Sequence, residues 1–153
     1  MSNQKGTKTS KASKMQHDEF TATGVFECSI QGEPILIDRS YIFYDLGNRT
    51  MNVWGVGPLE GKLSKVVTVA MSLDTKPGTY NLGHEPPYAY LLYTNEDWPG
   101  PDIPAETLRG TLTVVELNPE YLQVTASFEF HAWAFGQMLQ CVGSFELSLE
   151  RPS

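Results

Sequence analysis

The sequence predicts an all-β domain, and three observations support this fold class. After residue 20, apolar and polar residues alternate along most of the chain, as they do in strands with one buried face. The 13 Gly and 10 Pro place turn signals at the short intervals that are typical of sandwiches and barrels. No segment fits a helical period better than a strand period. We therefore expect an antiparallel β-sandwich of about eight or nine strands, with a flattened or partly open barrel as the alternative.

The last two strands have the clearest pattern. Along Leu122–Ala132 and Leu139–Leu149, every second residue is apolar or small and can face a core. The link 133–136 is short and contains Gly136, so the two segments form a long antiparallel hairpin. This hairpin should be central in its sheet, because its apolar faces are the most regular in the chain.

The same alternation predicts seven more strands, separated by turn sequences rich in Gly, Pro, Asp and Asn. Two stretches do not fit the pattern. We interpret Gly55–Gly61 as a wide turn or bulge, and Asn95–Glu106 as an acidic, Pro-rich loop in which a binding function could reside. The seven strands are Phe20–Ile30, Ile35–Tyr44, Thr50–Val56, Lys65–Leu73, Thr79–Leu82, Tyr88–Thr94 and Leu108–Leu117.

Charge divides the chain into a basic arm and an acidic body. Residues 1–17 hold four lysines and no acid, and their composition predicts a disordered tail. Residues 18–153 form a single all-β domain whose seven basic and 18 acidic residues give a net charge of -11. The partner of the folded part should therefore be basic or neutral rather than a nucleic acid, and only the arm could contact a phosphate.

The chain shows neither a secretory leader nor a transmembrane segment in its sequence, because its N-terminal lysines stand where a leader needs an apolar run. We therefore expect a cytoplasmic protein, unless a leader was removed or export needs none. Cys28 and Cys141 fall on inward strand faces, and a reducing cytoplasm favours two buried thiols over a disulfide.

The familiar catalytic and metal-binding patterns are missing from the sequence. Gly55, Gly57 and Gly61 have a spacing unlike a phosphate-binding loop, and no helix pattern follows them. The carboxylates of the acidic loop, Glu106 among them, lack the alternation of a calcium loop. His17, His84 and His131 lie on unlike elements, so a zinc site is not expected. We expect a protein that is not an enzyme and that uses no cofactor or metal.

Aromatic and acidic residues remain as candidates for a binding site. Trp98 is the strongest candidate because a tryptophan in a polar, Pro-stiffened loop has no core to fill. Trp54, Trp133 and Phe135 are expected on or beside strand ends, where aromatic rings ordinarily close a β core. Around Trp98 we group the neighbouring acids and two tyrosines of the adjacent strand as the predicted binding residues: Trp98, Asp97, Asp102, Glu96, Tyr88 and Tyr90.

The C-terminal half resembles a group of bacterial all-β domains of unknown function, often found as small lipoproteins in Bacteroidetes. The resemblance covers about residues 78–149 and rests on an ordered series of segments. This chain lacks the lipobox cysteine, and Thr125-Ala126-Ser127-Phe128 replaces the usual Gly-Thr-Phe. The resemblance implies the fold but no catalytic residues. The matching segments are GTYNL (Gly78–Leu82), AYLLY (Ala89–Tyr93), GTLTVVELN (Gly110–Asn118), VTASFEFHA (Val124–Ala132) and GSFELSL (Gly143–Leu149).

Together these features favour a non-enzymatic bacterial binding or interaction domain. One variety fits the charge, namely an immunity-like protein that neutralises a basic protein partner. The alternatives are a β-sandwich that binds a small ligand or glycan, and a hydrolase whose site the sequence does not reveal.

Overall fold

The computed structural model describes residues 21–58, 60, 63–95, 102–134 and 136–149. These residues form ten strands, and no helix among them is long and apolar enough to cross a membrane. The predicted tail 1–17 lies outside the described residues. The strands are β1 (Ala22–Ile30), β2 (Glu33–Ile35), β3 (Arg39–Asp45), β4 (Thr50–Val56), β5 (Leu63–Ser72), β6 (Gly78–Asn81), β7 (Tyr88–Asn95), β8 (Asp102–Asn118), β9 (Gln123–Ala134) and β10 (Gln137–Leu149).

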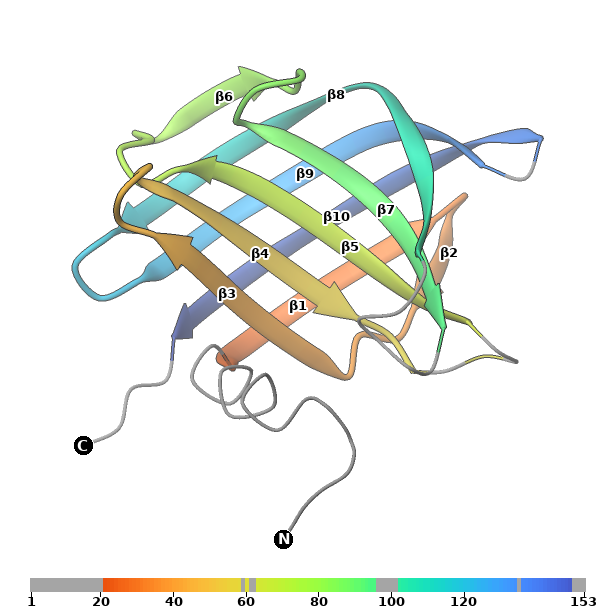
Figure 1. The fold of residues 1–153 in the computed structure, drawn as a ribbon, viewed down its shortest axis with the longest axis horizontal. Coiled ribbons are helices and arrows are strands. Elements are labelled where there is room, and N and C mark those ends of the chain that lie inside the picture. Colours follow the sequence, from red (N-terminus) through yellow and green to blue (C-terminus); the bar gives the residue numbers. More distant parts are fainter. Residues whose placement is uncertain (1–20, 59, 61–62, 96–101, 135, 150–153) are drawn as a thin grey trace, which may run out of the picture.

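The strands form two antiparallel sheets packed face to face (Figure 1). One sheet has four strands in the order β7-β5-β4-β3, and the other has six in the order β2-β1-β10-β9-β8-β6. The sheets are not closed into a barrel, which confirms the predicted sandwich. The β9–β10 hairpin is central in the six-stranded sheet, as predicted, and β1 pairs with β10 along its whole length.

Strand β8 connects the two sheets. Its first residues, Asp102–Ala105, pair with β7, and its remainder pairs with β9 from Glu106 onward. Between Thr107 and Arg109 the register with β9 shifts. A bulge bends a strand and increases its twist, so this irregularity lets one strand leave the four-stranded sheet and enter the other.

The core lies between the sheets and follows the predicted alternation. In β9 and β10 the inward positions are buried, and they include a cluster of phenylalanines. The rings of Phe26 and Phe145 stack with their centroids 5.3 Å apart, and Phe128 lies 6.0 Å from Phe26. The sequence pattern therefore identified the residues that hold the sandwich together.

Several strand boundaries differ from the prediction. The predicted strand Ile35–Tyr44 is divided, because Glu33–Ile35 forms the short β2 on the edge of β1 and β3 begins only at Arg39. Strand β8 begins at Asp102 instead of Leu108, so part of the predicted acidic loop is strand. Pro104 is tolerated there because β8 is paired with β7 but not yet with β9 at that point.

Two predictions covered Gly55, and the structure confirms the strand Thr50–Val56 rather than the turn or bulge that begins at Gly55. Gly55 belongs to β4, where it pairs with Ser40 of β3 and Val67 of β5, and it is not part of a turn. Glycine often marks a turn, but here its missing side chain makes room for the ring of Phe26 from the opposite sheet.

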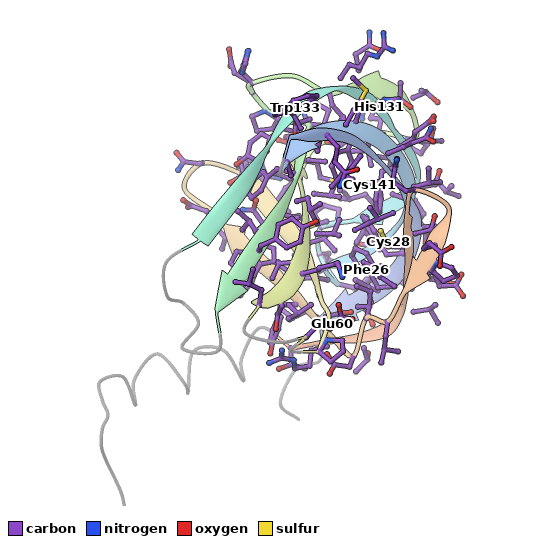
Figure 2. The ribbon with its side chains drawn as sticks, turned by 90° about the vertical axis from the view of Figure 1, so that its right-hand side faces the viewer. Phe26, Cys28, Glu60, His131, Trp133 and Cys141 are labelled. Atoms are coloured by element: carbon purple, nitrogen blue, oxygen red, sulfur yellow. The ribbon has the colours of Figure 1, made fainter. Side chains whose placement is uncertain are left out.

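Both cysteines are free, buried thiols. In the register of β1 and β10, Cys28 lies opposite Gly143, and Cys141 lies opposite Ile30. Figure 2 shows both side chains between the sheets, near Phe26. Burial raises the pKa of each thiol to about 12, so both stay protonated at neutral pH.

Candidate functional site

The outer face of the four-stranded sheet carries aromatic rings on three of its strands. The register aligns Tyr90 of β7, Thr68 of β5, Trp54 of β4 and Tyr41 of β3 in one row across the sheet. The next row consists of Tyr88, Ala70, Asn52 and Phe43. We call the five ring-bearing residues the aromatic face: Tyr41, Phe43, Trp54, Tyr88 and Tyr90.

The rings of the aromatic face lie close enough to interact with one another. Phe43 packs on Trp54 with centroids 4.7 Å apart, and Tyr41 stacks on Phe43 at 5.9 Å. On the other side of β5, Tyr88 and Tyr90 stack at 5.9 Å with their planes only 14° apart. The small side chains of Thr68 and Ala70 separate these two groups of rings.

The aromatic face is distinct from the core between the sheets. Along each strand its residues alternate with core residues such as Ile42, Val53 and Ala89, so they point to the other side. Phe43, Trp54 and Tyr90 pack instead on a second apolar cluster, and each is only partly buried. These three rings therefore cover a buried apolar layer on the outside of the sheet and remain partly accessible themselves. The second cluster consists of Tyr41, Val56, Val66 and Leu92.

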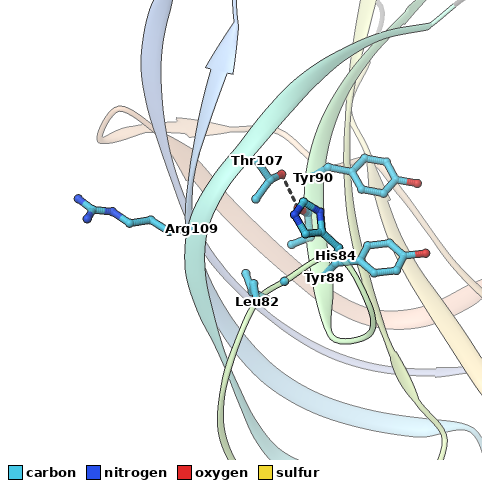
Figure 3. A pocket seen from close by; sticks show the side chains of 8 residues that line it. Leu82, His84, Tyr88, Tyr90, Thr107 and Arg109 are labelled. Atoms are coloured by element: carbon cyan, nitrogen blue, oxygen red, sulfur yellow. Dashed lines mark hydrogen bonds between the residues drawn. The ribbon is translucent and has the colours of Figure 1, made fainter.

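A pocket of about 440 Å³ adjoins the tyrosine end of the aromatic face. It lies between the β6–β7 connection and the first half of β8 (Figure 3). In that connection the peptide bond Pro86–Pro87 is cis, and the Gly83 amide donates to the Pro87 carbonyl at 3.1 Å. The pocket is lined by Leu82, Gly83, His84, Tyr88, Ala89, Tyr90, Thr107 and Arg109.

Five of the eight residues that line this pocket carry a polar side chain, namely His84, Tyr88, Tyr90, Thr107 and Arg109. The Thr107 hydroxyl donates to the backbone carbonyl of Ala89 and is therefore already occupied. His84 is exposed and lies beside the tyrosines, whereas Arg109 is directed away from them (Figure 3). Arg39 and Arg49 pair with Asp38 and Asp74, but Arg109 forms no ion pair with any described residue. The pocket can therefore hold a ring against tyrosine, but it presents no converging charged groups.

The structure brings together only part of the predicted binding residues. Tyr88 and Tyr90 lie side by side and line the pocket. Glu96, Asp97 and Trp98 lie outside the described residues. Asp102 is the first residue of β8 and pairs with Thr94, at the end of β7 opposite to Tyr88. The acidic loop and the tyrosine pair therefore do not form one compact site.

Three members of the aromatic face, Tyr41, Phe43 and Trp54, were not among the predicted binding residues. Trp54 was expected at a strand end, but it lies in the interior of β4 on the outer face of the sheet. Tyr93 lies on the same strand as Tyr88 and Tyr90 but faces the core, where burial raises the pKa of its hydroxyl. The available signal was the spacing of two residues between Tyr41 and Phe43 and between Tyr88 and Tyr90, which places each pair on one face of a strand.

The outer face of the six-stranded sheet is different in character. It exposes the acids Glu27, Glu129 and Glu146 among serine and threonine side chains, together with the apolar side chains of Val25, Trp133 and Val142. The Gln140 amide donates to the Glu129 carboxylate at 2.6 Å. The two outer faces of the sandwich therefore differ: one carries partly buried aromatic rings, and the other exposes carboxylates beside separate apolar side chains.

Within the described ranges, no three His, Cys, Asp or Glu side chains gather in an arrangement that could hold an ion. The acidic residues Glu96 and Asp97 lie outside those ranges.

Comparison with known proteins gives no further assignment. The chain matches no protein family model, no curated protein and no solved structure. The resemblance to the lipoprotein-like bacterial domains therefore stays a prediction.

Proposed function

We propose that this protein is a non-enzymatic binding domain that holds a basic segment of a protein partner on its aromatic face. The observation that carries this proposal is the set of partly exposed rings on the outside of the four-stranded sheet. An immunity-like role, in which the domain neutralises a basic protein, is the form of this function that agrees best with the charge.

Aromatic rings and a negative body favour the same kind of partner. Lysine and arginine side chains bind over the faces of tyrosine and tryptophan rings, each contact contributing about 0.5–1 kcal/mol at an exposed site. Aromatic residues are also the ones that most often dominate the energy of protein interfaces. The net charge of -11 on residues 18–153 would attract a cationic partner over a distance and accelerate association.

The experiment measures binding of a basic decapeptide to the full chain by calorimetry. A poly-arginine peptide serves as the probe, and a poly-glutamate peptide serves as the negative control. If the rings form the site, Tyr88→Ala combined with Tyr90→Ala should weaken poly-arginine binding by about tenfold, because two ring contacts are lost. Tyr121→Ala is the matched control, since Tyr121 is exposed but lies outside the aromatic face.

A second set of variants tests whether the peptide binds the rings or is held by the negative charge of the domain. Glu129→Gln and Glu146→Gln remove acids from the opposite face and should have only a small effect on poly-arginine binding. If these two substitutions weaken binding more than the tyrosine substitutions do, the peptide binds the acidic face and the proposed site is wrong.

The pocket beside Tyr88 favours a second function, the binding of a small ligand or glycan. Its volume of about 440 Å³ is within the usual range for such sites, and the stacked tyrosines could hold a sugar ring. A glycan and metabolite screen by thermal shift would test this function. A hit that is abolished by Tyr88→Ala and persists in high salt would favour it over the protein partner.

A further inference from the structure

The N-terminal arm joins the domain at the corner of the aromatic face. Residues 1–20 precede Thr21, which forms an antiparallel bridge with Tyr41, a member of that face. Twenty extended residues span up to about 66 Å, whereas four strands are roughly 15 Å across. Every ring of the aromatic face is therefore within reach of the arm.

The arm has the chemistry that the aromatic face is suited to bind. Lys5, Lys8, Lys11 and Lys14 recur at every third residue, and residues 1–17 contain no acid. In a polyproline II conformation three residues rise about 9.3 Å, so successive lysines would project from one side at that interval. Strands two positions apart are separated by about 9.6 Å, which is the arrangement of β7 and β4. The lysine interval thus matches the separation of Tyr90 and Trp54 across the sheet.

We propose that residues 1–20 bind back onto the aromatic face and cover it until a basic partner displaces them. The docking of the arm depends only on its lysines and the rings, whereas its displacement by a partner rests on the function proposed above. Tethering raises the local concentration of the arm to about the millimolar range, so weak lysine–ring contacts are sufficient to keep the face covered. The arm then acts as a built-in competitor that only a tighter basic ligand replaces.

The test uses the full chain with Trp54 as its only tryptophan, obtained by Trp98→Phe and Trp133→Phe. In this background Lys5, Lys8, Lys11 and Lys14 are all changed to Gln, and quenching of Trp54 fluorescence by acrylamide is measured. Loss of the lysines should raise the quenching constant by about twofold, because the ring loses its cover. In the protein with its lysines, 1 M NaCl should give the same rise, since the Debye length falls to about 3 Å.

A second probe reports on the opposite side of the sandwich. Trp133 is exposed near the end of β9, outside the aromatic face, and becomes the only tryptophan in a chain carrying Trp54→Phe and Trp98→Phe. Its quenching should not respond to the lysine substitutions. If Trp133 becomes more accessible and Trp54 does not, the arm lies elsewhere and the proposal is wrong. Protection of Trp54 that depends on protein concentration and ignores the lysines would show that a second copy covers the face, which also overturns it.

A peptide experiment distinguishes this inference from the proposed function. A synthetic peptide of residues 1–20 is added to the lysine-to-glutamine variant, and a poly-arginine decapeptide is added in parallel. Both should protect Trp54 from acrylamide. If only poly-arginine protects it, the arm does not dock but the proposed binding function is retained. If neither peptide protects Trp54, both the docking and the proposed function are refuted.

Discussion

The ring of Phe26 in β1 packs directly on the backbone of Gly55 in β4. A Cβ atom at position 55 would lie 2.8 Å from Cε1 of Phe26, closer than such atoms normally approach. Because β1 and β4 belong to different sheets, this contact fixes how near the two layers of the sandwich come at that point. Phe26 also stacks on Phe145, so the position of the ring is set from both sides.

We therefore predict that Gly55→Ala destabilises the domain. The added methyl group must push the Phe26 ring or separate the sheets, and such overpacking should lower the free energy of unfolding by about 1–3 kcal/mol. Urea denaturation measures this change. Gly83→Ala is the control, because a Cβ at Gly83 meets no atom within 4 Å, and its effect should stay within about 0.5 kcal/mol.

A double-mutant cycle identifies the cause. Phe26→Leu shortens the side chain that occupies the space above Gly55, so adding Gly55→Ala to it should cost much less than in the parent protein. If Gly55→Ala is equally costly with Leu at position 26, the ring contact is not the reason for the loss.

This contact also shows why part of the fold could not be read from the sequence. A glycine near Pro58 looks like a turn signal, and only the position of Phe26 about 30 residues earlier in the chain explains Gly55. By contrast, the strands β9 and β10 were predicted with their inward residues, because alternation is a local property that the hydrophobic core enforces along the whole strand.

The candidate site, like the fold, could be predicted only in part from the sequence. Tyr88 and Tyr90 share a strand, so their spacing alone placed them on one face. Their alignment with Trp54 and Tyr41 depends on the register of β7, β5, β4 and β3, which is set by long-range pairing. The start of β8 was missed because Pro104 disfavours a strand, and only its pairing with β7 shows that this proline is tolerated.

An exposed ion pair gives a prediction about pH. Arg49 donates to both carboxylate oxygens of Asp74, at 2.7 Å from Nη2 to Oδ1 and 2.9 Å from Nε to Oδ2. This bonding lowers the pKa of Asp74. A carboxylate with a lowered pKa stabilises the fold at neutral pH, and this contribution is lost as the pH falls through the folded-state pKa.

An NMR titration of the Asp74 carboxyl group should therefore give a pKa below that of an ordinary aspartate. Arg49→Gln should return it toward the ordinary value, and high salt should do so in part, because both side chains are exposed. Arg39→Gln is the matched control and should leave Asp74 unchanged. A pKa of Asp74 that does not respond to Arg49→Gln would contradict the pairing in solution.

The buried thiols predict a loss of stability at high pH. Burial raises the pKa of Cys28 and Cys141 to about 12, above the value of about 8.5 in an unfolded chain. Since the folded pKa is the higher one, the stabilisation is fully present below about pH 8.5 and is lost between there and about pH 12. Each thiol should lower the free energy of unfolding by up to about 1.4 kcal/mol per pH unit in that interval.

Urea denaturation between pH 8 and pH 10 measures this loss. Replacing both cysteines by alanine should reduce the dependence on pH, although it lowers stability at every pH because two core side chains become smaller. Tyr93→Phe is a useful comparison, because burial raises the pKa of Tyr93 as well. If the double cysteine variant keeps the full pH dependence, other groups are responsible for it.

Two threonines near the aromatic face, the buried Thr68 and the partly buried Thr107, should respond in opposite directions to replacement by valine. Thr68, between Tyr90 and Trp54, is fully buried, and its Oγ1 has no hydrogen-bond partner among the described residues. Valine has nearly the same shape and removes this unsatisfied group, so Thr68→Val should raise the free energy of unfolding by about 1 kcal/mol.

Thr107→Val is the matched control, because its hydroxyl donates to the Ala89 carbonyl and that bond would be lost. It should lower the free energy of unfolding by about 1 kcal/mol, leaving a difference of about 2 kcal/mol between the two variants in the same denaturation assay. A loss of stability on Thr68→Val would mean that the hydroxyl has a partner in solution. The aromatic face would then contain a bound water or a polar contact between Tyr90 and Trp54, and it would be less apolar than its rings suggest.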